Sequence, residues 1–132
     1  MGLYSEETTL AYFAGFFDGE GCITIRASKD DLPYLILQTS QKSIAVLEEM
    51  RKVFGGNIHT NTDGSFIHVT AGKYAEGMLR ALLPYLFVKL AQAELAIEFC
   101  NIGQGKSRMF TEDELQRRRD IDMELRRLKK VV

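Results

Sequence analysis

Residues 12–22 read YFAGFFDGEGC, and this stretch decides how the rest of the chain is interpreted. Its first half belongs to an uncharged segment, residues 8–17, that predicts a buried helix. Asp18 and Glu20 follow at the end of that helix. A carboxylate at a helix C-terminus meets the negative end of the helix dipole, which costs about 0.3–1 kcal/mol. We therefore expect a compensating positive group, and a divalent metal ion held by oxygen ligands is the natural candidate. In the alternative interpretation the two acids only end the helix and begin a glycine-rich turn.

The predicted helix also carries a stripe of small residues. Ala11 and Gly15 are four residues apart, with Ala14 beside them, so another backbone could approach this side closely. The chain has no second copy of this helix, which favours a symmetric contact with a second chain, that is, a homodimer. The remaining faces carry aromatic side chains that we expect to fill the core, namely Phe13, Phe16 and Phe17.

Residues 13–21, FAGFFDGEG, resemble the defining motif of the LAGLIDADG homing endonucleases. The resemblance implies metal-assisted hydrolysis of DNA phosphodiesters by a homodimer, without a covalent intermediate. In this reading Glu20 from each chain binds Mg2+ together with the Gly19 carbonyl. Asp18 is better placed to accept backbone hydrogen bonds at the end of the helix than to bind the metal directly.

Two further positions match the family locally. Gln41 ends the segment LQTSQ where the family places a polar residue that positions water, and Lys89 ends PYLFVK where the family places a charge-stabilising lysine. The alternatives are a polar strand end for Gln41 and a solvated helix lysine for Lys89. At position 45 the chain has Ala45 where some relatives keep a basic residue, so part of the surroundings of the site is missing or supplied elsewhere.

Composition limits the remaining classes. With 132 residues, 45% hydrophobic and 27% charged, the chain fits one compact domain over residues 1–132. No secretory leader or membrane span is visible, so we expect an intracellular protein of the cytoplasm, nucleoid or an organelle that has no membrane partner. A net charge of −1 argues mildly against nucleic-acid binding, unless the acids gather away from the binding face. Most of the remaining glutamates do fall in predicted helices.

The periodicity predicts the element order αββαββααα, in the α+β class. This order resembles the αββαββα LAGLIDADG core, a saddle-shaped antiparallel sheet with helices packed on its back, followed here by a C-terminal helix. Helices are expected from Ser5 to Asp18, over 44–54, after Lys73, over 88–102 and from Thr111, where Glu114 completes a capping box. One hairpin is expected to pair residues 23–26 with 34–38. A second is expected to pair residues 57–62 with 65–70 across a tight Asp63-Gly64 turn.

One face of this sheet is predicted to be polar. Such a two-stranded ribbon suits the major groove of double-stranded DNA, although a solvated sheet face is the alternative. Ile58, Ile67 and Val69 are expected to face the core, with His59 or its neighbours on the other side. The expected DNA contacts are Cys22, Thr24, Arg26, Ser28, Lys29, Tyr34, Ile36, Gln38, Ser40, His59, Asn61, His68 and Thr70.

The C-terminal arginines are interleaved with acids. Arg117, Arg118 and Arg119, followed by Arg126 and Arg127, favour a solvated helix with ion pairs, and contacts to flanking DNA are the alternative. The two strand histidines fit polar surface or DNA contacts better than general bases.

Three functions agree with these features. The first is a homodimeric DNA endonuclease that cleaves a long, nearly palindromic site. The second is a related RNA-splicing maturase, and the third is a catalytically silent DNA-binding regulator. Glu20 together with Gln41 and Lys89 favours the endonuclease over the silent regulator.

Overall fold

The computed structural model describes residues 6–27, 33–102 and 110–131. In these ranges the chain forms the predicted α+β fold around an antiparallel sheet, which has four strands in the order β1-β2-β4-β3. The elements are α1 (Glu6–Glu20), β1 (Gly21–Ala27), β2 (Pro33–Gln41), α2 (Ile44–Phe54), β3 (Asn57–Thr60), β4 (Phe66–Ala71), α3 (Gly72–Leu82), the 3-10 helix η1 (Leu83–Tyr85), α4 (Leu90–Asn101) and α5 (Glu112–Val131).

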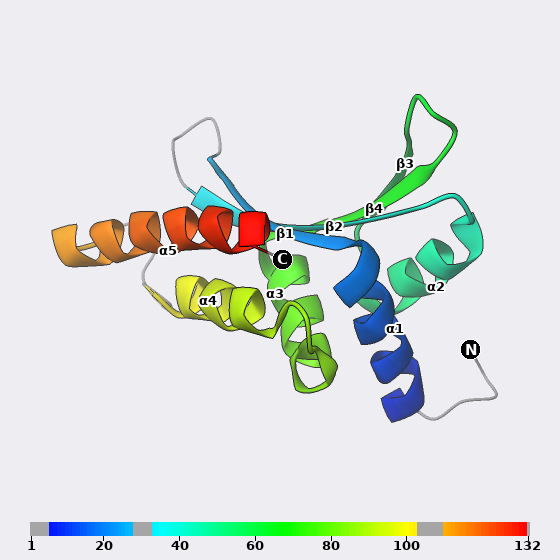
Figure 1. Ribbon diagram of the computed structural model, residues 1–132, viewed down its shortest axis with the longest axis horizontal. Coiled ribbons are helices and arrows are strands. Elements are labelled where there is room, and N and C mark those ends of the chain that lie inside the picture. Colours follow the sequence, from blue (N-terminus) through cyan, green and yellow to red (C-terminus); the bar gives the residue numbers. More distant parts are fainter. Residues whose placement is uncertain (1–5, 28–32, 103–109, 132) are drawn as a thin grey trace.

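The sheet is curved like a saddle, with both hairpins rising at its ends (Figure 1). Helices α1 to α4 lie beneath it, and α5 runs beside the edge strand β1 (Figure 1). The core between sheet and helices includes Phe13, Phe17, Leu37, Met50 and Leu79, none more than 1% exposed. We call the face of the sheet turned away from α1 to α4 the open face.

The first hairpin has the predicted faces. Ile23 pairs with Leu37 and Ile25 with Leu35, and all four side chains are buried on the helix side. Because side chains alternate along a strand, the open face receives the residues between them. On β1 and β2 these are Cys22, Thr24, Arg26, Tyr34, Ile36, Gln38 and Ser40.

In the second hairpin β3 has the predicted faces, with Ile58 against the core and His59 exposed on the open face, but β4 has the opposite arrangement from the one predicted. His68 pairs with Thr39 and Thr70 with Leu37, so both face the helices, where they are 0% and 1% exposed. The prediction that His68 and Thr70 contact DNA is therefore wrong. Their neighbours Ile67 and Val69, expected in the core, lie on the open face instead.

Polar partners beneath the sheet explain this arrangement. His68 Nε2 donates to the Gly55 carbonyl at 2.8 Å, and Thr70 Oγ1 donates to Met78 Sδ at 3.6 Å. Burial lowers the pKa of His68 below its ordinary value of 6.5, and the nearby charge of Arg51 acts in the same direction. The histidine is therefore held as a neutral hydrogen-bond donor inside the fold.

The turn between β3 and β4 is longer than predicted. The strands end at Thr60 and begin again at Phe66, so five residues connect them. Asn61 N–H donates to the Ser65 carbonyl at 2.8 Å, and the Asn61 side-chain amide donates to Ser65 Oγ at 2.9 Å. Asn61 therefore belongs to the turn and not to a strand face, which corrects its predicted position.

Helix α5 begins with the predicted capping box, in which Thr111 N–H donates to Glu114 Oε1 and Glu114 N–H donates to Thr111 Oγ1. Arg118 departs from the solvated pattern: its guanidinium stacks on Phe99 and Phe110 and donates to the Pro33 carbonyl at 3.0 Å. Burial lowers the pKa of Arg118 below its ordinary value. The other arginines make the expected surface contacts: Arg117 with Glu98, Arg119 with Gln116, Arg126 with Asp122 and Arg127 with Glu124.

Some predictions lie outside the described residues, namely the helix start at Ser5 and the contacts of Ser28 and Lys29. Within the described ranges, no helix is both long and apolar enough to cross a membrane.

Candidate active site

The site is built where α1 passes directly into β1. A side chain on Gly21 would place its Cβ 2.3 Å from the Phe17 ring, so only glycine allows Phe17 to pack under the first strand residue. Phe17 is fully buried and anchors this junction to the core. The junction fixes the last turn of α1, which carries Asp18, Gly19 and Glu20, at the edge of the open face.

Asp18 is bonded into the fold by both carboxylate oxygens. Oδ2 accepts the backbone N–H of Phe87 at 2.8 Å and of Val88 at 3.2 Å, and Oδ1 accepts that of Lys89 at 3.0 Å. These donors lie at the N-terminal end of α4, where backbone N–H groups point toward an anion. The positive partner expected for a carboxylate at this helix end is thus supplied to Asp18 by α4, and both of its oxygens are already engaged.

Lys89 completes a reciprocal contact with the same residue. Its Nζ donates to the main-chain carbonyl of Asp18 at 2.7 Å, while its own N–H is held by the Asp18 carboxylate. The half-buried lysine therefore places its positive charge at the carbonyl end of α1, on a residue two positions before Glu20. The structure brings Lys89 to the α1 end across a separation of 71 residues.

Glu20 is the exposed acid of the pair. Its carboxylate makes no hydrogen bond or ion pair with any other residue in the described ranges. A Cβ added to Gly19 would meet nothing within 4 Å, so the backbone beside Glu20 is also open. Among the described residues no group of three or more His, Cys, Asp and Glu side chains could hold a metal ion. At the α1–β1 junction, as far as the structure describes it, one copy of the chain thus offers the Glu20 carboxylate and a neighbouring carbonyl, which is an incomplete set of oxygen ligands.

Gln41 lies at the end of β2, on the same side of the sheet as this junction. Its Oε1 accepts the N–H of Lys42 at 2.7 Å, and in the described part of the chain its side chain forms no hydrogen bond with Asp18, Glu20 or Lys89. It lines a groove of about 440 Å³ between α1 and α2. Tyr12 and Phe16 form the α1 wall of that groove, so Phe16 is only half-buried.

The small-residue stripe on α1 is shifted from its predicted position. Ala11 and Gly15 are exposed, and a Cβ on Gly15 would meet nothing within 4 Å. Ala14 is 0% exposed inside the core of its own protomer, so its predicted place in a dimer interface is wrong. Tyr12, which the sequence analysis missed, is 55% exposed on the same surface.

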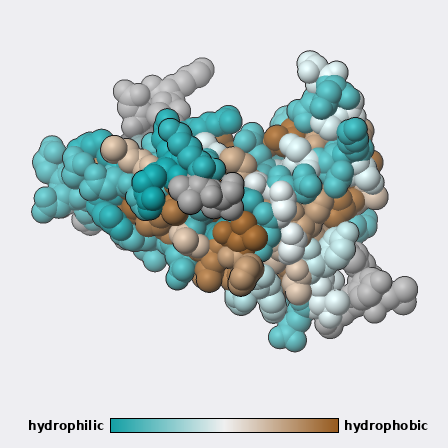
Figure 2. All heavy atoms as spheres, viewed as in Figure 1, coloured by the Kyte–Doolittle hydropathy of each residue, from teal (hydrophilic) through white to brown (hydrophobic). Residues whose placement is uncertain are grey.

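A second exposed apolar surface adjoins this helix. Phe87, Val88 and Leu90 are 87%, 47% and 38% exposed where the chain enters α4, and the backbone N–H groups of Phe87 and Val88 are themselves bonded to Asp18. Figure 2 shows hydrophobic residues gathered over η1 and this part of α4. Periodicity could not indicate this surface, because the segment is a connection between helices and not a regular helix.

The open face has a charge pattern of its own. The four strands, as the structure describes them, contain no Asp or Glu, whereas Glu48, Glu49, Glu76, Glu94 and Glu98 lie on α2, α3 and α4 beneath the sheet. The predicted segregation of acids is therefore present. Arg26 and His59 are exposed on this face, and Ile36 on the same side is only 5% exposed and offers almost no surface for a contact.

Comparisons with known proteins agree with this geometry. The sequence profile of the family described as LAGLIDADG endonuclease matches residues 13–90. The DNA endonuclease I-CvuI of Chlorella vulgaris is 31% identical over 107 residues, which make up 72% of this chain and 65% of that protein. The intron-encoded DNA endonuclease ai2b of Dictyostelium discoideum is 34% identical over 65 residues, or 48% of this chain and 23% of that protein.

Among solved structures, the crystal structure of I-CvuI in complex with its target in the presence of calcium has a TM-score of 0.77 and 25% sequence identity. The match covers 92% of this chain and 82% of that chain. The chain thus spans less than two thirds of the full length of the two relatives found by sequence.

Proposed function

The chain belongs to the LAGLIDADG endonuclease family, and from this premise we propose that it is a site-specific double-strand DNA endonuclease that works as a homodimer. The observation that carries the proposal is the exposed Glu20 carboxylate beside an open face whose strands contain no acid. A nuclease needs an anionic metal ligand next to a surface that tolerates phosphates, and these two features meet at the α1–β1 junction. The Dictyostelium relative is intron-encoded, and we propose the same origin for this chain.

DNA recognition is assigned to the open face. Arg26 and Gln38 project from neighbouring strands on this side, and Arg and Gln are the side chains that bridge guanine and adenine in the major groove. The curvature of the sheet would let both hairpins follow a groove (Figure 1). Few cations lie on the face, so we expect a moderate dependence of binding on salt.

A homodimer is supported by glycines that the protomer itself does not need. Gly15 and Gly19 have open space where a side chain would be, in contrast to Gly21, where Phe17 forbids one. Unfilled glycines on an exposed helix suit close approach of a second copy at a symmetry axis. A dimer would also bring together two Glu20 carboxylates, whereas one copy supplies only one.

The ligands available at the junction fit a hard divalent cation, since carboxylate, carbonyl and phosphate oxygens are what Mg2+ prefers. Glu20 and the Gly19 carbonyl would hold Mg2+, and Asp18 would keep the helix end in place through α4. When bound, the ion supplies positive charge that activates water and stabilises the leaving oxygen. Lys89 would place its ammonium near the scissile phosphate, and Gln41 would orient water from the end of β2.

The test is selection of cleaved sites from a randomised DNA library in Mg2+, followed by assay of Glu20→Gln. The variant keeps the shape of the side chain but removes the anion, so we expect site-specific binding with cleavage slower by about 10³-fold or more. Glu94→Gln, an exposed acid on α4, is the matched control and should cleave at the unmodified rate. Cleavage by Glu20→Gln at the unmodified rate would place the metal elsewhere.

The same selection separates the other candidate functions. A silent DNA-binding regulator would enrich a bound site without cutting it, even in Mg2+. A splicing maturase would bind its intron RNA more tightly than any selected duplex. Either result would replace the endonuclease proposal.

The dimer requires its own measurement. Gly15→Leu places two side chains where the backbones should meet, so the dissociation constant should rise by about tenfold or more. Gly77→Leu on α3 is the matched control, because Gly77 is also an exposed helical glycine with nothing within 4 Å of an added Cβ. Sedimentation at micromolar concentration, with and without target DNA, gives the result. A monomer in both conditions contradicts the symmetric site.

A further inference from the structure

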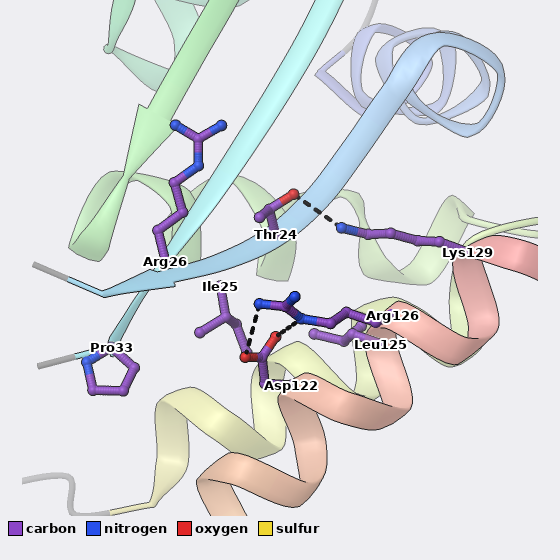
Figure 3. A pocket seen from close by; sticks show the side chains of 8 residues that line it. All are labelled: Thr24, Ile25, Arg26, Pro33, Asp122, Leu125, Arg126 and Lys129. Atoms are coloured by element: carbon purple, nitrogen blue, oxygen red, sulfur yellow. Dashed lines mark hydrogen bonds and ion pairs between the residues drawn. The ribbon is translucent and has the colours of Figure 1, made fainter. Parts of the chain in front are cut away.

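Helix α5 reaches the open face from outside the sheet. In its last turn Lys129 donates from Nζ to Thr24 Oγ1 at 2.9 Å, across a separation of 105 residues (Figure 3). The two residues line a groove of about 630 Å³ between α5 and β1. In the same groove Arg126 pairs with Asp122, while Arg26 points away from α5 on the other side of β1 from Ile25 (Figure 3).

The contact controls the hydrogen-bonding state of Thr24. A hydroxyl has one proton to donate and two lone pairs that accept, whereas an ammonium group only donates. With Lys129 occupying one lone pair, the Thr24 proton is directed elsewhere. In this structure its neighbour on the open face is Cys22 Sγ, 3.3 Å from Oγ1. Sulfur is a weak acceptor, so a stronger oxygen or nitrogen acceptor can replace it.

We propose that Lys129 is a positioning residue for base recognition, which makes Thr24 read hydrogen-bond acceptors on DNA. The inference rests on the proposed DNA-binding function of the open face. In the major groove guanine, adenine and thymine present acceptors, whereas the exposed group of cytosine is an N4 donor. Because Thr24 accepts a hydrogen bond from the Lys129 ammonium, its hydroxyl is a stronger donor and its remaining lone pair a weaker acceptor, so it disfavours cytosine at the position that it faces. Without Lys129 both lone pairs can accept at full strength, and this preference relaxes.

The experiment measures binding of the selected site and all of its single-base variants. Thr24→Val identifies the position that Thr24 faces. At that position Lys129→Met should raise the relative affinity for cytosine by about three- to tenfold, the range for one hydrogen bond. In the Thr24→Val background Lys129→Met should produce no further change in base preference. Lys129→Arg retains a donor and should restore the discrimination, which a merely structural role would not predict.

Lys130→Met is the matched control, because Lys130 is the next residue, carries the same charge and is exposed. It should weaken all sequences equally. If Lys129→Met also weakens all sequences equally and lowers the salt dependence by about one charge, Lys129 is a phosphate contact and the inference is wrong. A change in preference that persists in Thr24→Val also overturns it. If the unmodified protein selects no DNA site at all, the proposed function itself fails, and the inference with it.

Discussion

The β1–β2 hairpin places its polar side chains on the open face, whereas β4 of the second hairpin buries polar side chains beneath the sheet and places apolar ones on the open face. In the first, Thr24 and Arg26 face outward and Ile25 is buried. In the second, His68 is buried and Val69 faces outward. The two halves of the open face therefore differ in chemistry.

The positions of the strands explain the difference. Strand β4 is central in the order β1-β2-β4-β3, and the helix side beneath it offers polar partners: the Gly55 carbonyl at the end of α2 and Met78 on α3. A polar side chain that finds a partner can be buried at little cost. On the open face, Val69 lies opposite Gln38. We infer that the first hairpin reads DNA by hydrogen bonds and that β4 of the second hairpin does so by apolar contact, with His59 on β3 as a polar neighbour.

The largest expected effect is on stability, and it uses the two histidines of the second hairpin. His68→Ala leaves the Gly55 carbonyl unpaired and opens a cavity, so the free energy of unfolding should fall by about 2–4 kcal/mol. His59→Ala removes an exposed side chain from the open face and should change it by less than about 0.5 kcal/mol. Urea unfolding of both variants gives the comparison. Equal effects would mean that His68 is not buried as described.

The same histidine gives a pH signature. Because burial lowers the pKa of His68 in the folded state, the unfolded chain binds more protons below its ordinary pKa of 6.5. The contribution of neutral His68 to the free energy of unfolding is thus fully present above about pH 6.5. It decreases as the pH drops toward the pKa of His68 in the folded state, and below that pKa it is lost completely. His68→Gln does not titrate and should lack this part of the acid loss, whereas His59→Gln should retain it.

The contrast between the hairpins also shows how much of the fold can be predicted from the sequence. Alternation of Ile23 and Ile25 with Thr24 and Arg26 predicts both the strand and its faces, because polarity and burial coincide there. In β4 the alternation of Ile67 and Val69 with His68 and Thr70 is just as regular, but it predicts the two faces the wrong way round, because the polar side chains are the buried ones there. The deciding partner, the Gly55 carbonyl, is 13 residues away in the chain. The long Asn61–Ser65 turn added to the error, since a two-residue turn was expected.

In the candidate site, too, some residues can be predicted from the sequence and others cannot. Asp18 and Glu20 follow from one local motif, and the backbone hydrogen bonds expected for Asp18 are present. Sequence spacing could not identify the donors at the start of α4, because tertiary packing brings them to Asp18. Ala14 was placed on the wrong side of α1 because small residues are equally suited to a tight core and to a close interface. The role of Lys129 could not be predicted, because its partner Thr24 lies 105 residues away in the sequence.

A smaller effect tests whether the two hairpins recognise DNA by different chemistry. Arg26→Ala should relax preference at one base pair of each half-site by about 1–3 kcal/mol, because a bidentate contact to guanine would be lost. Val69→Thr keeps the shape of the side chain but replaces a methyl group with a hydroxyl, so any preference for thymine should fall by about 0.8 kcal/mol, the value of one buried methyl group. Binding to all single-base variants of the selected site measures both.

The pattern of loss is more informative than its size. Each substitution should affect one position in each half-site, and the two positions should differ, since Arg26 lies on the edge strand β1 and Val69 on the central strand β4. Uniform weakening by Arg26→Ala with a lower salt dependence would make Arg26 a phosphate contact and remove it from base recognition. If Val69→Thr instead creates a new preference as strong as the one lost with Arg26, the second hairpin also reads by hydrogen bonds. The contrast between the hairpins would then describe only their packing beneath the sheet, and not how the open face meets DNA.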